Sequence, residues 1–85
     1  MRIIKRSGQN EKFSLNKLRL SVTYASDRSG KPLNKGDLDV VVSEIMQIIG
    51  NRDSIKSVHI KMITAGVLYV LGFREISKQY SDFKV

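Results

Sequence analysis

Apolar residues recur at intervals of three and four along most of this chain, in runs that end at glycine or proline. This spacing brings them to one face of an α-helix, whereas a strand would need a period of two. Four helices are predicted, over residues 15–27, from about 35 to 49, from 57 to 71 and over 73–83. Because an apolar face must be covered, the helices are expected to pack into a bundle.

Capping and breaking residues set the ends of these helices. Ser14 stands before the first helix, where its hydroxyl can accept hydrogen bonds from first-turn amides, and Ser57 is the predicted N-cap of the third. Pro32 and Gly50 end the first and second helices. The stretch 62–71 is apolar on more than one face, so the third helix is expected to be the most buried of the bundle.

Two short extended segments, 2–6 and 10–13, flank a turn at Ser7 and Gly8. Glycine allows the positive φ that tight turns often need, so a β-hairpin is predicted there. Phe13 is expected to anchor this hairpin to the core. The predicted fold class is α+β and mostly α, a four-helix bundle with a small N-terminal β-hairpin cap.

The length of 85 residues leaves room for one modest core, and no repeat or linker divides the chain. Residues 1–85 are therefore expected to form a single domain. The absence of cysteine excludes disulfides and thiolate metal ligands. No apolar run approaches a signal-peptide core or a membrane span of about 18 residues, so a cytoplasmic protein without a membrane partner is predicted.

Positive charge is concentrated at the N-terminal end. The chain has 15 Lys and Arg against 8 Asp and Glu, a formal net charge of +7, and Glu11 is the only acid among the first nineteen residues. A positive field attracts phosphates on nucleotides, nucleic acids or anionic membranes and does not distinguish them. Composition therefore indicates an anionic ligand without identifying it.

Residues that could perform catalysis are scarce. His59 is the only histidine and has no cysteine for a dyad, and the acids are scattered singly. General-base chemistry needs a partner within hydrogen-bond reach, and a metal needs a second ligand at suitable spacing. The sequence therefore predicts neither catalytic residues nor a metal site, and the chain is not expected to be an enzyme.

Two segments could bind phosphate together. Lys5 and Arg6 lead into the Ser-Gly turn, whose backbone amides can face an anion. Ser14 and Lys17 begin the first helix, where exposed amides and the helix dipole favour negative charge. The lysine lacks the GxxxxGK[ST] frame, so this is not a P-loop. On spacing alone, a phosphate site and an ordinary polar hairpin fit about equally well.

The order of these residues resembles the signature of the ATP-cone family. The chain reads Lys-Arg-x-Gly-x-x-Glu-x-Phe-x-x-x-Lys-Leu from Lys5 to Leu18, with Phe13 and Lys17 where the family places an aromatic residue and a lysine. The similarity continues through a Gly-Lys-Pro-Leu loop, an Asp-Ser-Ile-Lys-Ser segment and a late Leu-Gly-Phe, and it covers essentially residues 2–84.

This resemblance implies an allosteric nucleotide-binding module without catalytic activity. ATP cones occur in ribonucleotide reductase large subunits and in the bacterial repressor of reductase genes, where binding of ATP or dATP changes the assembly. For this chain it implies ATP or dATP as the bound effector, with Mg²⁺ accompanying the nucleotide. The implied partner is a second copy of the chain or a larger protein regulated in cis or in trans.

The resemblance also assigns ligand contacts in the N-terminal segment. Lys5, Arg6 and Lys17 match family positions that contact the nucleotide, mostly its phosphates. Glu11 matches a position associated with the base and the sugar. These four residues are expected to form one wall of the site.

The other wall is expected at the start of the third helix. Ser57 stands where the family often has a threonine or serine that touches the ligand, and Lys61 matches a position that can meet the phosphates. Ser7 and Ser14 replace residues that are usually Asp or Asn in the family. Serine still shapes a turn and caps a helix, but a ribose contact from position 14 would be reduced, so the preference between ATP and dATP stays open.

Two other functions stay open. The third and fourth helices are short enough for a helix-turn-helix, and the charge suits DNA or RNA, although the basic residues gather on the hairpin and not along one recognition helix. A cone that had lost its ligand would serve only as a protein-interaction domain.

Overall fold

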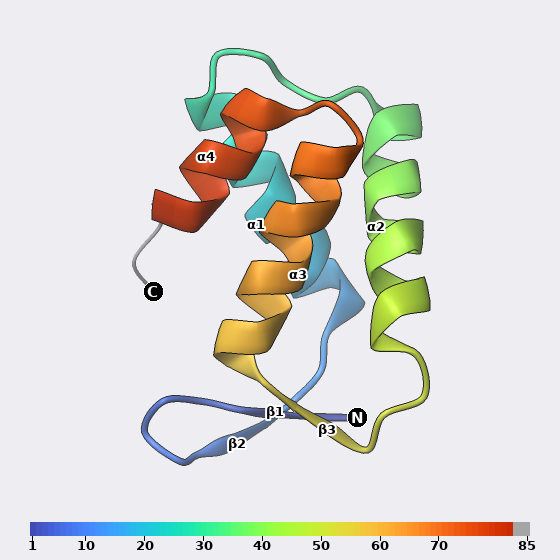
Figure 1. Cartoon of the computed structure of the whole chain (residues 1–85). Coiled ribbons are helices and arrows are strands. Elements are labelled where there is room, and N and C mark those ends of the chain that lie inside the picture. Colours follow the sequence, from blue (N-terminus) through green and yellow to red (C-terminus); the bar gives the residue numbers. More distant parts are fainter. Residues whose placement is uncertain (83–85) are drawn as a thin grey trace.

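The computed structural model of this chain describes residues 1–82. These residues form, in order, β1 (Arg2–Ile4), β2 (Asn10–Lys12), α1 (Leu15–Arg28), α2 (Lys35–Ile49), β3 (Ser54–Lys56), α3 (Ser57–Val70) and α4 (Arg74–Asp82). The strands lie at one end of the helices, where β2 leads into α1 and β3 into α3 (Figure 1). The predicted fold class, α+β and mostly α, is confirmed. The predicted end of the fourth helix at residue 83 lies outside the described residues.

The N-terminal hairpin forms as predicted, with shorter strands. Ile3 of β1 pairs with Glu11 of β2 in antiparallel register. The Gly8 amide donates to the Lys5 carbonyl at 2.9 Å, and the Lys5 amide donates to the Gln9 carbonyl at the same distance. Gly8 has a φ of 86°, so this tight turn closes on a positive φ that glycine adopts without strain.

A third strand joins this sheet, and the sequence patterns do not predict it. β3 pairs with β1 in parallel, with Ile55 opposite Ile3 and Lys56 opposite Ile4, which gives the order β2-β1-β3. Three residues are too few to show a periodicity, so only the pairing itself reveals the strand. As a result, the start of α3 lies beside the end of β1.

The helix starts follow the prediction in α1 and depart from it in α3. Ser14 caps α1 as predicted, because its hydroxyl accepts a hydrogen bond from the Lys17 amide at 3.3 Å. The prediction of Ser57 as N-cap is wrong: Ser57 is the first residue of α3, and Lys56 flanks it without a side-chain cap. Lys56 is still extended and paired with β1, so the helix begins only at the next residue.

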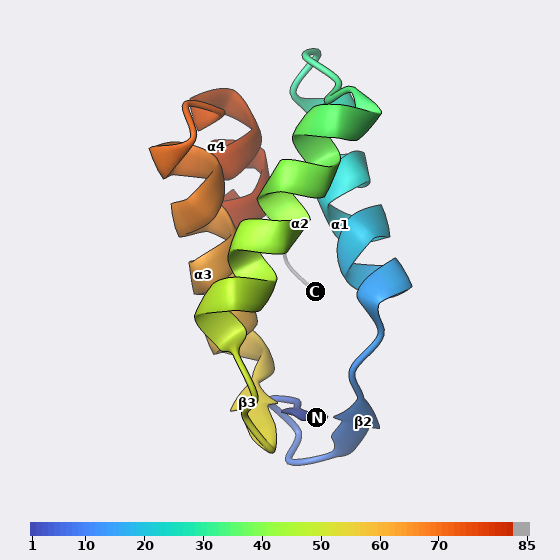
Figure 2. The ribbon, with the colours of Figure 1, turned by 90° about the vertical axis from the view of Figure 1, so that its right-hand side faces the viewer.

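The core lies between the three longer helices, which run beside one another above the sheet (Figure 2). Val22 of α1, Ile45 of α2 and Leu68 of α3 are 0% exposed, and Ile55 of β3 closes the end of the core near the sheet at 4%. α4 packs against α1 and α3. Phe13 is half-buried and packs against this core, which confirms its predicted role as an anchor.

The share of buried and half-buried residues is at least as large in α3 as in α1 and α2, in line with the expectation for the third helix, but one side of α3 stays exposed. Met62, Tyr69 and Val70 are 66%, 56% and 83% exposed. Within residues 1–82, the main neighbours of α3 are α2, α4 and β3, and they leave these three side chains exposed. The excess of apolar residues on this helix therefore forms exposed surface.

One buried polar group in α3 gives a stability prediction. Thr64 is 0% exposed, and its hydroxyl has no hydrogen-bond partner within residues 1–82. A buried hydroxyl without a partner costs about 1 to 3 kcal/mol. Thr64→Val keeps the shape and removes the hydroxyl, so we expect it to raise the free energy of unfolding in urea by about 1 kcal/mol.

Thr23→Val is the matched control, because the Thr23 hydroxyl donates to the Arg19 carbonyl at 2.9 Å. This substitution removes a formed hydrogen bond and should lower the free energy of unfolding by about 0.5 to 1 kcal/mol. A loss of stability in Thr64→Val as large as that in Thr23→Val would show that the buried hydroxyl is paired in solution.

Candidate functional site

Three side chains from separate elements form an ion-pair cluster, here called the Lys5–Glu11–Lys17 cluster. The ammonium group of Lys5, just beyond β1, lies 2.8 Å from Oε2 of Glu11 on β2. The ammonium group of Lys17, in the first turn of α1, lies 2.5 Å from Oε1 of the same carboxylate. The lysine side chains are 51% and 72% exposed, against 27% for Glu11. Solvent therefore reaches the two cations more readily than the anion between them.

The two lysines hold Glu11 in its charged form. The hydrogen bond from Lys17, and after it the one from Lys5, lowers the pKa of Glu11 from an ordinary 4.5 to about 2. The carboxylate is therefore ionised at neutral pH. With two positive charges and one negative charge, the cluster keeps a net positive charge that faces solvent.

Local structure fixes Lys17 within this cluster. Ser14 has an extended backbone and caps α1, so it sets the direction in which the first turn of the helix leaves the hairpin. The Phe13 amide donates to the Met1 carbonyl at 3.1 Å, which extends the pairing of the hairpin up to this cap. The side chain of Lys17, three residues after Ser14, consequently reaches back to Glu11 on β2.

The start of α3 lies next to the cluster through the sheet. Since Lys56 is opposite Ile4 in parallel register, Lys5 and Ser57 are the next residues after two paired strands. α3 has no side-chain cap and no acidic residue in its first turn. Its first amides and the positive end of its dipole are thus available to an anion.

The remaining predicted residues lie around these elements. Arg6 is exposed in the turn of the hairpin, and Lys61 is half-buried one turn after Ser57 on α3. Neither belongs to the Lys5–Glu11–Lys17 cluster. Lys56 is a basic residue at this end of the sheet that the sequence patterns do not single out. No sequence signal identifies it, because β3 is only three residues long and is revealed by its pairing with β1.

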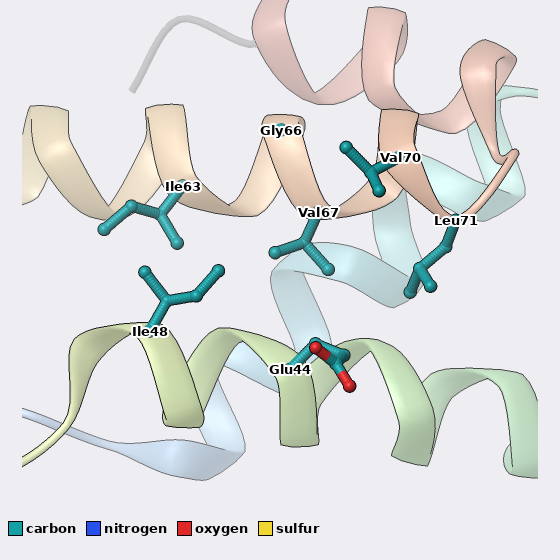
Figure 3. Close-up of a pocket in the computed structure, with 7 residues that line it drawn as sticks. All are labelled: Glu44, Ile48, Ile63, Gly66, Val67, Val70 and Leu71. Atoms are coloured by element: carbon teal, nitrogen blue, oxygen red, sulfur yellow. The ribbon is translucent and has the colours of Figure 1, made fainter.

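A second surface feature has the opposite character. An open groove of about 310 Å³ runs between α2 and α3, and Ile48 and Ile63 face one another across it (Figure 3). Glu44 is the only charged residue among those that line it, and Val70 and Leu71 lie at its far end from Ile63. The groove is apolar and separate from the lysines of the cluster.

Neither a metal-binding group of side chains nor a membrane-spanning helix is found among residues 1–82. These residues contain no group of three or more His, Cys, Asp and Glu side chains that could hold a metal ion. None of the helices formed by this part of the chain has the length and apolar character needed to cross a membrane.

The cluster gives a prediction about pH. Because the folded-state pKa of Glu11 lies below the ordinary value, its ion pairs stabilise the fold above about pH 4.5 and lose this effect as the pH falls through about 2. We expect the pKa of Glu11, measured by NMR titration, to rise from about 2 toward 4.5 in Lys17→Met. Lys12→Met, an exposed lysine on the same strand, should leave it unchanged. An unchanged pKa in Lys17→Met would contradict the ion pair.

Comparison with known proteins places the chain in a family. Curated proteins give no match. A protein-family model described as the ATP cone domain matches residues 1–84, essentially the whole chain. ATP cones are nucleotide-binding regulatory domains, and they bind ATP or dATP as effectors. The match includes the cluster and the start of α3, and the chain is a member of the ATP-cone family.

Proposed function

We propose that this chain binds ATP or dATP where the hairpin, the start of α1 and the start of α3 meet, and that it performs no turnover of the nucleotide. Mg²⁺ accompanies the phosphates. The phosphate chain lies against the basic residues, and the base and sugar lie toward Glu11. The proposed contacts are Lys5, Arg6, Glu11, Ser14, Lys17, Ser57 and Lys61.

The observation that carries this proposal is that two exposed lysines share one carboxylate in the sheet from which α3 starts without a side-chain cap. Lys5 and Lys17 share one carboxylate, and Ser57 begins α3 beside the end of β1. A polyphosphate is long enough to touch cations from two elements and the amides of a third. Membership of the ATP-cone family supports an adenine nucleotide as the source of those phosphates.

Removal of either lysine tests the site. A hydrogen bond between a charged group and phosphate is worth about 1.5 to 3 kcal/mol, so Lys5→Ala and Lys17→Ala should each weaken ATP binding at least about tenfold in calorimetry. Lys12→Ala is the control, since Lys12 is exposed on β2 and outside the cluster, and it should change the affinity less than about twofold. Unchanged ATP affinity in both cluster variants would show that the site lies elsewhere.

Two further ligands separate the alternative functions in the same assay. Titration with dATP gives the preference between the two effectors, which Ser14 leaves open. Titration with a short DNA duplex tests nucleic-acid binding, which would be strongly salt-dependent and indifferent to ATP. Binding of neither adenine nucleotide nor DNA would favour a protein-interaction domain.

The second part of the proposal is that nucleotide binding changes the association of the chain with another copy of itself. Support comes from α3, which begins beside the cluster at Ser57 and ends in the apolar groove at Val70. A small change in the position of its first turn would shift the wall of the groove. A second copy of the chain carries a formal net charge of +7, so its surface supplies cations that can pair with Glu44 in the groove.

Val70→Asp tests the use of the groove. Val70 is 83% exposed, so the substitution should change the free energy of unfolding by no more than about 0.5 kcal/mol. We expect it to leave ATP affinity unchanged and to abolish ATP-dependent association in sedimentation velocity. Leu20→Asp, at a 50% exposed position of α1 outside the groove, is the control. Equal association of the parent and Val70→Asp would contradict a role for the groove.

A further inference from the structure

The anion nearest to the two cluster lysines belongs to the protein itself. Both oxygens of Glu11 are occupied, one by Lys5 at 2.8 Å and the other by Lys17 at 2.5 Å. Glu11 is the middle residue of β2 and pairs with Ile3 of β1, so the hairpin fixes its backbone. The carboxylate therefore occupies the position from which an external phosphate would neutralise the same two cations.

A phosphate cannot simply be added to this arrangement. If it met both ammonium groups while Glu11 kept its ion pairs, two anions would lie within a few ångströms of one another, and like charges at that distance repel. The lysines are more exposed than Glu11, so they can turn toward solvent while the carboxylate stays on the strand. Binding then exchanges one anion for another.

We propose that Glu11 is a specificity-determining residue that competes internally with the ligand for Lys5 and Lys17 and thereby rejects polyphosphates that carry no hydrogen-bond donor. This role rests on the proposed function in one respect, that the same lysines receive the phosphates of the nucleotide. It goes beyond that function because it assigns Glu11 a task in the nucleotide-free molecule.

The selectivity follows from what happens to the displaced carboxylate. A charged group that loses its partners beside a second anion is costly unless new donors replace them. A nucleoside triphosphate whose base carries an amino group can supply a donor along with its phosphates. Inorganic tripolyphosphate supplies only negative charge, so it would leave Glu11 unpaired. The site should therefore prefer amino-bearing nucleotides over bare phosphate chains of equal charge.

The test compares ATP with inorganic tripolyphosphate in calorimetry at fixed ionic strength. Glu11→Gln removes the competing charge, so it should bind tripolyphosphate at least about tenfold more tightly than the parent. Its gain in affinity for ATP should be smaller than its gain for tripolyphosphate, because the neutral amide oxygen of glutamine is a weaker acceptor for the base than the carboxylate that it replaces. Glu75→Gln makes the same change in net charge at an exposed position of α4, outside both the cluster and the groove, and should alter neither affinity.

Equal tripolyphosphate affinity in the parent and Glu11→Gln would overturn the proposal, as would the same gain in Glu75→Gln. If the parent does not bind ATP but Glu11→Gln gains tripolyphosphate affinity, the proposed function fails and the competitor role stands. If the parent binds ATP and Glu11→Gln shows no gain in tripolyphosphate affinity, the proposed function stands and the competitor role of Glu11 fails.

A measurement on the unsubstituted chain guards against a variant that folds poorly. With ¹³C-labelled glutamate at neutral pH, the carboxyl signal of Glu11 should shift when ATP saturates the protein, because both ion pairs are exchanged. The signal of Glu75, which lies on α4 outside the cluster and the groove, should stay in place. A Glu11 signal that does not move would show that the ion pairs persist, which also overturns the proposal.

Discussion

The parallel pairing of β1 with β3 is the interaction on which the rest of the site depends. It joins Ile3 to Ile55, about fifty positions apart along the chain, by backbone hydrogen bonds. Without it, the hairpin would be connected to the bundle only through α1. With it, the start of α3 is held beside Lys5, and the helix continues from there to the apolar groove at its other end.

Electrostatics and packing have separate tasks in this small molecule. Packing of Val22, Ile45 and Leu68 holds the helices together without any charge. The cluster adds ion pairs at the junction between the hairpin and α1, beside the apolar anchor Phe13, and it leaves two cations accessible. The Glu11 carboxylate can thus hold Lys5 and Lys17 in place in the nucleotide-free molecule and compete with the phosphates of the proposed ligand for them.

Much of this fold follows from local pattern. Helical spacing predicts all the helices, and Gly8 predicts the hairpin turn, because each signal lies within a few residues. β3 and the extended Lys56 that flanks α3 could not be predicted, since both depend on a strand partner distant in sequence. The signature identifies Lys5 and Lys17 as candidate ligands, but their shared ion pair with Glu11 links three elements, and only the folded chain brings these together.

The long separation between β1 and β3 also bears on how the protein is made. The hairpin closes a short loop and can form early, whereas strand pairing over some fifty residues must await most of the chain. During translation, the first strand leaves the ribosome long before its parallel neighbour is synthesised. A nascent chain would therefore display the basic hairpin alone, and the elements of the proposed site come together only after the beginning of α3 has emerged.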